Sequence, residues 1–430
     1  MGRKGRISGK IEEATLSNGI TVVAETIPQL RSVSIGVWVR AGSATETEQI
    51  NGASHLLEHL FFKGTKRRSY RDINEAIELV GGVANAYTAR EYTFMYMKVI
   101  DEHLGIAIDL LSDILLNSVF DEGEFRKEKR VIIEEIKTAE DTPEDRVHEA
   151  AVRLLWPDHP LGLPIGGDKR VVRSLSREQV VEYFRRWYNA RATLIALAGN
   201  VRLEQVLPEL ERAFGRMRRG RAFRELNSLP GVGHRVLTRH KKLLQVHLCM
   251  MYPAVSIRSE ERFAFYLLNN ILGASSASRL FHTIREKYGL AYDAYTYTEL
   301  LTQTGFIGIY VAVAPHNLGR CLRLVVSEIE RMRVEPVSER ELETAKEQFK
   351  SSTFLSVENT FNRMVRIAKG KLLRGQIEPL ERVIQRVERV TADEIQALAY
   401  RLFDPAKLNM VVLGPIKRAD RVLINNWHNG

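Results

Sequence analysis

Apolar and polar positions alternate in several short segments of the first half of the chain, and longer helical patterns separate them. Alternation with many β-branched and aromatic residues predicts strands. The segments with this pattern are residues 19–27, 33–42, 83–89, 92–100 and 193–201. Apolar residues that recur every three or four positions predict helices. The segments with that pattern are residues 69–81, 102–116 and 122–140, with a further helix that ends near Phe214.

The second half of the chain repeats the first. "VANAYTA" (83–89) matches "AYDAYTY" (291–297), and "HLGIAIDLLSDIL" (103–115) matches "NLGRCLRLVVSEI" (317–329). Self-similarity at a nearly constant distance along a chain indicates a repeated structural unit. The sequence therefore predicts two similar domains rather than one continuous core.

The boundary between the two domains is predicted at residues 215–233. This segment loses the apolar periodicity and is rich in Gly, Pro and charged residues, which is typical of a linker. It leaves residues 1–214 as a first domain and residues 234–430 as a second. Single cores stop growing at roughly 250–300 residues, so two domains also agree with the length of the chain.

One repeated segment keeps its apolar residues and changes its polar ones. "HLLEHLF" (55–61) matches "YLLNNIL" (266–272). The three polar differences are His55, Glu58 and His59 against Tyr266, Asn269 and Asn270. The shared apolar residues are what packing requires, so the two histidines and the glutamate of the first half are additional to packing.

The histidines of this segment are spaced as metal ligands on a helix. Positions i and i+4 share a helix face, so His55 and His59 can direct their imidazoles at one ion. Catalytic zinc usually has three protein ligands and an open position for water, and a carboxylate such as Glu58 can take the proton of that water. The five residues alone would fit a solvated helix face equally well.

A third ligand is expected from the helical pattern at residues 122–140. Its candidates are Glu128, Glu134 and Glu135. Glu128 and Glu135 are seven residues apart and share one face of a helix that its apolar residues predict to be mostly buried, and a carboxylate on a buried face needs a cation or hydrogen-bond donors. The alternative is a set of salt bridges to Lys127, Lys129 or Arg130, and this alternative is favoured for Glu134. The spacing does not choose between Glu128 and Glu135.

The motif resembles that of a known family. "GASHLLEHLFFKGT", followed by Glu135 in "EKRVIIEEI", is similar to the pitrilysin family, whose HxxEH motif inverts the HExxH of other zinc proteases. The chain most resembles the shorter members, such as the catalytic subunit of mitochondrial processing peptidase and its bacterial relatives. The resemblance implies one Zn²⁺ ion per chain held by His55, His59 and Glu135. It also implies Glu58 as the general base and Glu128 as a residue that orients a ligand histidine.

The resemblance extends into the second half. "SRLFHTIREKYGLAY" is similar to an Arg-Tyr segment of the family, which implies that Arg285 and Tyr292 contact the region of the scissile carbonyl. Both side chains can donate hydrogen bonds to an oxyanion as it forms. Without the resemblance, Arg285 would be read as a helix residue paired with Glu286, and Tyr292 as a half-buried strand residue.

The resemblance also implies a site for the substrate. "VANAYTAREYT" lies beside the metal in relatives and acts as a sheet edge that receives an extended peptide. Asn85, Ala86 and Tyr87 are therefore candidate substrate-binding residues. The alternative is that they are ordinary strand residues, which the copy "DAYT" in the second half partly supports.

The fold that the resemblance implies is α+β, with two homologous domains that form half of a clamshell. Each domain has a mostly antiparallel six-stranded sheet flanked by helices. The implied function is that of a zinc-dependent endopeptidase that hydrolyses unfolded or extended peptides inside a closed chamber. A homodimer, or a heterodimer with a non-catalytic relative, would complete the chamber.

Two other functions are considered. One is a catalytically silent assembly subunit related to the processing-peptidase core proteins, whose members lose ligands or the base. The other is a metal-dependent hydrolase without a peptide substrate. All the motif residues are present in this chain, and the domain repeat accompanies them, so the sequence favours the peptidase.

Composition adds limits on partners and location. The chain has 63 Lys and Arg against 53 Asp and Glu, a net charge of +10, but the basic residues are dispersed except at residues 216–221. No nucleic-acid partner is therefore expected. No apolar run reaches the roughly 18 residues that a membrane span requires. Cys249 and Cys321 form no CxxC pair, so neither a disulfide scaffold nor a cysteine zinc site is expected, and a bacterial cytoplasm is favoured over a mitochondrial matrix.

Overall fold

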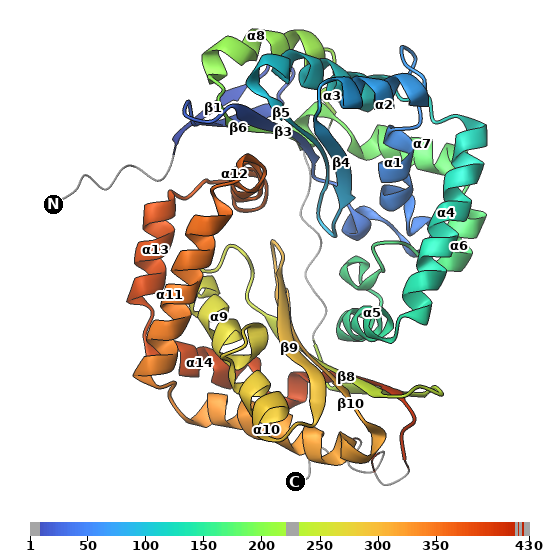
Figure 1. Ribbon diagram of the computed structural model, residues 1–430. Coiled ribbons are helices and arrows are strands. Elements are labelled where there is room, and N and C mark those ends of the chain that lie inside the picture. Colours follow the sequence, from blue (N-terminus) through green and yellow to red (C-terminus); the bar gives the residue numbers. More distant parts are fainter. Residues whose placement is uncertain (1–8, 221–231, 418–419, 421–423, 425–430) are drawn as a thin grey trace, which may run out of the picture. The chain divides into compact units, whose positions relative to one another are not determined.

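The structure is a computed structural model that describes residues 9–220, 232–417, 420 and 424 (Figure 1). Its described residues form two compact units. The first consists of residues 9–137, 163–220 and 353–381, and the second of residues 138–162, 232–352 and 382–417 with residues 420 and 424. Most of the predicted linker, residues 221–231, lies outside the described residues.

The first unit is built on a six-stranded sheet in the order β1-β2-β6-β3-β5-β4. Its neighbouring strands are antiparallel, except for the parallel pair β2 and β6. The strands are β1 (Lys10–Thr15), β2 (Thr21–Thr26), β3 (Ser32–Val39), β4 (Val83–Thr88), β5 (Thr93–Ile100) and β6 (Thr193–Gly199). The strand β4 lies at one edge of this sheet.

Helices cover both faces of the first sheet (Figure 1). The helices of this unit are α1 (Ala53–Phe61), α2 (Tyr70–Leu79), α3 (Leu104–Asn117), α4 (Glu122–Asp141), α6 (Lys169–Ser174), α7 (Arg177–Trp187), α8 (Leu203–Phe214) and α12 (Thr360–Arg374). Of α4, the residues up to Lys137 belong to this unit. Successive side chains of β3 point to opposite faces of the sheet. Val33, Ile35 and Val37 join the core with α1 and α3, whereas Trp38 points toward Met364 of α12.

The helix α12 approaches the sheet closely because β3 has a glycine below it. A Cβ atom at Gly36 would lie 2.6 Å from the Met364 sulfur. The buried Glu25 of β2 pairs with Arg363 at 2.7 Å and with Arg366 at 3.5 Å, so two cations of α12 satisfy one carboxylate inside the unit. A segment from the second half of the chain thereby completes the unit formed by the first half.

The second unit has a sheet in the order β7-β11-β8-β10-β9, antiparallel except for the pair β7 and β11. Its strands are β7 (Arg235–His240), β8 (Val246–Ala254), β9 (Ala291–Leu300), β10 (Gly305–Val313) and β11 (Asn409–Gly414). Its helices are α5 (Pro143–Leu155), α9 (Arg262–Asn269), α10 (Leu318–Val334), α11 (Glu339–Ser356), α13 (Leu380–Arg389) and α14 (Ala392–Leu402), with π-helical turns at Asn270–Ala274 and Phe281–Lys287. Of α11 the residues up to Ser352 belong to this unit, and of α13 the residues from Arg382 onward.

The helix α5 is the counterpart of α12, because it comes from the first half of the chain and packs on the sheet of the second unit. His148 of α5 is bonded through Nδ1 to the Tyr297 hydroxyl at 2.7 Å and through Nε2 to the Tyr295 hydroxyl at 3.0 Å. The division predicted from the sequence, 1–214 and 234–430, is contiguous and does not include this exchange of two segments.

Short 3₁₀ helices complete the described secondary structure. They are Ser43–Thr45, Glu48–Ile50, Asp101–His103, Pro160–Gly162, Ala190–Ala192, Pro315–Asn317 and Pro405–Lys407. None of the helices in the described part of the chain combines the length and the hydropathy that a membrane crossing requires.

The predicted fold class is confirmed: two mostly antiparallel sheets are each flanked by helices. The first unit has the six strands that were predicted, and the described residues of the second unit form five. The sixth strand was expected from the resemblance alone, because the sequence pattern of the second half does not specify it.

Candidate metal centre

The helix α1 carries the HxxEH residues on the side that faces away from the core. Leu56, Leu57, Leu60 and Phe61 are at most 1% exposed and anchor the helix in the first unit. His55, Glu58 and His59 occupy the remaining positions and are partly exposed. The 3.6-residue period therefore separates a packing face from a polar face, as the sequence predicted.

The start of α1 is held by a buried carboxylate that comes from outside the helix. Gly52 precedes the helix with a φ of 101°, a conformation that favours glycine, and its side chain cannot cap the first turn. Glu46 does so instead: its carboxylate accepts hydrogen bonds from the backbone N–H of Gly52 at 2.8 Å, the N–H of Ser54 at 2.7 Å and the Asn51 amide at 2.9 Å. His55 follows directly, so Glu46 sets where the first histidine lies.

The environment of Glu46 is fully buried, and burial raises its pKa to about 7 against the hydrogen bonds that lower it. The N-terminus of a helix favours a negative charge, which offsets part of the burial cost. Sequence reasoning missed this residue. Its signal is weak, because an acid seven residues before a helix has no fixed spacing relative to a cap.

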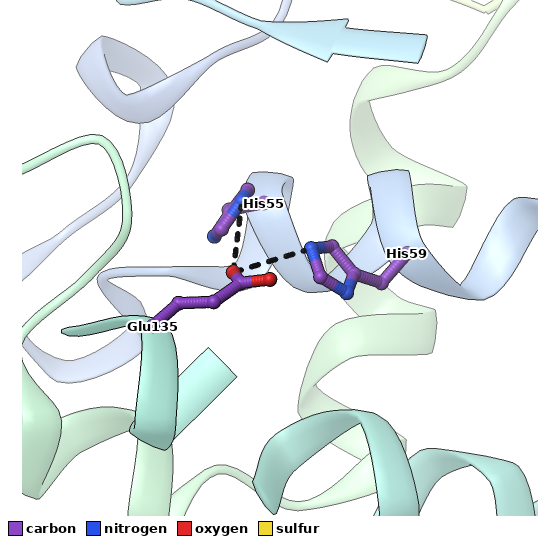
Figure 2. A group of neighbouring side chains, drawn as sticks. All are labelled: His55, His59 and Glu135. Atoms are coloured by element: carbon purple, nitrogen blue, oxygen red, sulfur yellow. Dashed lines mark ion pairs between the residues drawn. The ribbon is translucent and has the colours of Figure 1, made fainter. Parts of the chain in front are cut away.

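His55, His59 and Glu135 form the one potential metal-binding cluster found among the described residues, with one ligand atom from each within 4.8 Å of the others (Figure 2). Glu135 extends from α4 toward both imidazoles. Its Oε2 atom lies 3.9 Å from His55 Nε2 and 3.6 Å from His59 Nε2. The two rings are 4.8 Å apart between centroids and nearly perpendicular, at 79°.

This arrangement fits a zinc ion. Two ligand atoms at about 2.0–2.1 Å from a tetrahedral ion lie about 3.4 Å from each other. The distances from Glu135 Oε2 to the two imidazole nitrogens, 3.6 and 3.9 Å, are close to that value. Two histidines and one carboxylate are also a common protein ligand set of catalytic zinc, which leaves one position open.

Glu128 lies two turns before Glu135 on α4 and contacts a different nitrogen of His59. Its Oε2 atom is 3.0 Å from His59 Nδ1, and its Oε1 atom is 2.9 Å from the Lys63 ammonium. The Glu128 side chain is 8% exposed, against 50% for Glu135. The structure therefore distinguishes the two acids that the spacing left open: Glu135 faces the Nε2 atoms of both histidines, whereas Glu128 contacts Nδ1 of His59.

The salt bridge expected for Glu134 is present, but its partner is Lys137 at 2.7 Å rather than one of the three cations named from the sequence. Lys137 is one turn further along α4, and the pair lies on the solvent face. Lys129 instead donates to the backbone oxygens of Arg173 and Leu175.

Burial shifts the pKa of His55, a member of the cluster, and that of Glu58, which lies on the same helix, in opposite directions. The pKa of His55 is lowered to about 4, mainly by burial and further by His59, while Glu135 opposes the shift. His55 is therefore neutral at neutral pH, which is the form that binds a metal. Burial raises the pKa of Glu58, against a hydrogen bond from Thr88 and the charge of His59. A carboxylate with a raised pKa is a stronger base.

The other predicted site residues lie in the second unit and at the edge of the first sheet. The Arg285 guanidinium lies 4.9 Å from the ring centres of both Phe281 and Tyr292. Tyr292, the second residue of β9, is 71% exposed, so its interpretation as a half-buried strand residue is wrong.

The edge strand β4 presents its predicted residues on two faces. Ala86 is 5% exposed and belongs to the core, whereas Asn85 is exposed and Tyr87 is 52% exposed. Among the described strands β4 pairs only with β5, so the backbone along its other side is that of a sheet edge. An edge strand can pair with an added strand through its main chain.

Comparison with known proteins identifies the class to which this fold belongs. Residues 21–169 match the family model described as insulinase (peptidase family M16), and residues 174–349 match the peptidase M16 inactive domain. YmxG of Bacillus subtilis, described as an uncharacterized zinc protease, is 37% identical over 393 residues, which cover 91% of this chain and 96% of that protein. The chain is thus a relative of zinc proteases. It belongs to peptidase family M16, the insulinase/pitrilysin family, which confirms the resemblance drawn from the motif.

Two solved structures share the fold. A protease from Helicobacter pylori has a TM-score of 0.88 at 20% identity and covers 94% of this chain and 99% of its own. A peptidase M16 inactive domain from Pseudomonas fluorescens has a TM-score of 0.89 at 16% identity and covers 95% of this chain and 98% of its own. At these identities the similarity establishes the two-unit fold.

Proposed function

We propose that this protein is a zinc-dependent endopeptidase of the processing-peptidase-like kind. The observation that carries the proposal is the convergence of one ligand atom each from His55, His59 and Glu135 within 4.8 Å, with Glu58 on the same helix as the histidines. One Zn²⁺ ion per chain would be held by these three residues. When bound, zinc polarises a peptide carbonyl and makes water a nucleophile near neutral pH.

The protein's own residues supply the proton transfers and the positioning. Glu58 takes the proton of the attacking water and delivers it to the leaving amine, which its raised pKa favours. His55 is kept neutral by burial, so no proton has to leave it before it binds a metal. Glu128 accepts a hydrogen bond from His59 Nδ1 and so leaves Nε2 for the ion.

Arg285 and Tyr292 are proposed to donate hydrogen bonds to the oxyanion of the tetrahedral intermediate. The exposure of the Tyr292 ring and its packing against the Arg285 guanidinium support this role. Tyr292→Phe is therefore expected to lower turnover while zinc content stays the same.

The substrate is proposed to be an unfolded or extended peptide that adds a strand to β4 at Asn85, Ala86 and Tyr87. Pairing through the main chain tolerates many side chains. A closed chamber, formed by a homodimer or by a heterodimer with a non-catalytic relative, would exclude folded proteins, and a cytoplasmic location agrees with the two buried free cysteines.

The experiment that tests the proposal compares two adjacent glutamates of α4. Purified wild-type protein is expected to hold about one zinc per chain and to cleave an unstructured peptide of about 20–30 residues, long enough to pair as an extended strand. Glu135→Gln should lose both zinc and cleavage, and a chelator should abolish cleavage. Glu134→Gln removes the same charge one residue away, outside the cluster, and should retain both.

The outcomes separate the peptidase from the silent assembly subunit. Cleavage that disappears with Glu135→Gln and persists with Glu134→Gln supports the peptidase. A wild-type protein without zinc and without cleavage would favour the assembly subunit. If the Glu135→Gln protein still held stoichiometric zinc, the ligand assignment would be wrong.

A further inference from the structure

Lys63 contacts the far side of the carboxylate that holds His59. The Glu128 carboxylate joins two partners through its two oxygens: Oε2 meets His59 Nδ1 at 3.0 Å, and Oε1 meets the Lys63 ammonium at 2.9 Å. All three side chains are largely enclosed, with 18% of His59, 8% of Glu128 and 24% of Lys63 exposed. The three groups therefore form a chain from a solvent-shielded cation to a predicted ligand.

The position of Lys63 is fixed by the end of the metal helix. Its backbone N–H donates to the Leu60 carbonyl at 3.1 Å, which closes the last turn of α1. Its ammonium lies 4.9 Å from the centre of the Tyr70 ring, so the aromatic face holds the same group that reaches Glu128. His59 and Lys63 leave the same end of α1, and Glu128 on α4 bridges them.

The Lys63 ammonium fixes the orientation of the Glu128 carboxylate. Lysine has three donors and no acceptor, so Oε1 of Glu128 is occupied as an acceptor and the rotation of the carboxylate is set. The other oxygen is then directed at Nδ1 of His59. A histidine that donates through Nδ1 keeps the lone pair of Nε2 free, and Nε2 is the atom that faces Glu135. A buried carboxylate also costs free energy without a paired cation.

We propose that Lys63 is a positioning residue of the metal centre: through Glu128 it orients His59 so that Nε2 is presented to the metal ion. The inference rests on the proposed function, since it concerns the same centre. Lys63 does not face the predicted ligand atoms itself. Its effect is therefore expected on metal affinity and on the ligand field of the bound ion.

The test is a set of three substitutions measured by metal binding. Lys63→Met keeps an unbranched side chain beside Tyr70 and removes the ammonium, and it should weaken zinc affinity about 10- to 100-fold, the range typical of residues that support a ligand. Lys63→Arg restores a donor to Glu128 and should recover most of the affinity. Lys66→Met removes the same charge from an exposed lysine three residues further on and should bind zinc like the wild type.

A spectroscopic readout separates positioning from general stability. In the cobalt-substituted protein, the visible absorption bands report the geometry of the ligands. They should shift in Lys63→Met, return toward the wild type in Lys63→Arg, and stay unchanged in Lys66→Met. A thermal unfolding curve of each metal-free variant shows whether Lys63→Met folds; if it does not, Lys63→Gln, which keeps a donor without the charge, takes its place and should give an intermediate loss.

The inference and the proposed function fail in different ways. A wild-type protein that binds no zinc overturns the metal centre itself. A wild-type protein that binds zinc, with Lys63→Met equal to it in affinity and in the cobalt spectrum, overturns the role of Lys63 and leaves the centre standing. Equal losses in Lys63→Met and Lys66→Met would reduce the effect to net charge and would also overturn it.

Discussion

The helices α1 and α9 have the same apolar pattern and different polar residues. In α1 the buried residues are Leu56, Leu57, Leu60 and Phe61. The matching residues of the second unit are Leu267 and Leu268 of α9 and Ile271 and Leu272 of the π-helical turn that follows it. All eight are at most 5% exposed. The apolar pattern alone therefore places a helix against its sheet in each unit.

The polar residues of the two helices do different things. In α1, His55 and His59 meet Glu135. At the place of His55, α9 has Tyr266, whose ring packs on Phe349 with 5.8 Å between centroids. A side chain on this face is thus free to serve packing in one unit and metal binding in the other, because the core requires nothing of it.

The partner helices differ in the same way. Counted from their first residues, Glu122 of α4 and Glu339 of α11, the positions of Glu128 and Glu135 correspond to Ala345 and Ser352. Ala345 is buried, as Glu128 is. A metal centre thus needs matched changes on two helices, and the second unit has neither.

The largest effect is expected when His59 is replaced by the residue at the matching position of the second unit, Asn270. His59→Asn should remove stoichiometric zinc and reduce turnover below detection, because the metal contributes several kcal/mol to catalysis. Zinc per chain and kcat/KM on the same preparation measure this. Full zinc occupancy in this variant would contradict the assignment of His59.

A smaller effect is expected from the polar residue that does not bind the metal. Glu58→Gln should keep zinc and lower kcat by about 10²–10⁴-fold, the usual contribution of a general base. Metal analysis beside steady-state kinetics measures both. The role of Glu58 as base would be wrong if kcat stayed near the wild-type value.

The shared scaffold predicts equal costs in the two units. Leu57→Ala and Leu268→Ala each remove a fully buried leucine at matching positions, and each should lower the free energy of unfolding by about 2–5 kcal/mol. Urea denaturation of the metal-free protein measures this. A cost confined to one helix would show that the apolar positions are not equivalent.

The smallest effect concerns pH and is specific to α1. The pKa of His55 is about 4 in the folded protein and near its ordinary 6.5 in the unfolded chain, so the unfolded chain binds the proton first. Stability of the metal-free protein should therefore fall as pH drops from about 6.5 to about 4, by about 3 kcal/mol at about 1.4 kcal/mol per pH unit. Denaturation at several pH values measures the slope.

The control for this slope is His55→Gln, which should reduce it. Part of the slope will persist, because burial also lowers the pKa of His148, His159 and His247. An unchanged slope in His55→Gln would mean that His55 is not held neutral by its surroundings.

The sequence by itself predicted the strands β2 to β6, the helices α1 to α4 and α8, and one side of the candidate centre. Helical period places His55, Glu58 and His59 on one helix, and this relation is local, so it needs no knowledge of the fold. The internal repeat likewise showed two related units, because it compares the chain with itself.

The spacing did not choose between the two acids of α4, and the resemblance only implied the choice; the tertiary structure shows that Glu135 faces the two histidines and which residues support them. Glu128 and Glu135 share a helix face, and their distance from α1 depends on how two separate helices pack. Lys63 contacts Glu128 of another helix, and Glu46, from before α1, binds the backbone at the start of α1. Each of the helices α5 and α12 belongs to the unit formed mainly by the other half of the chain. Periodicity reports which face of an element is buried, whereas these pairings depend on which buried faces meet.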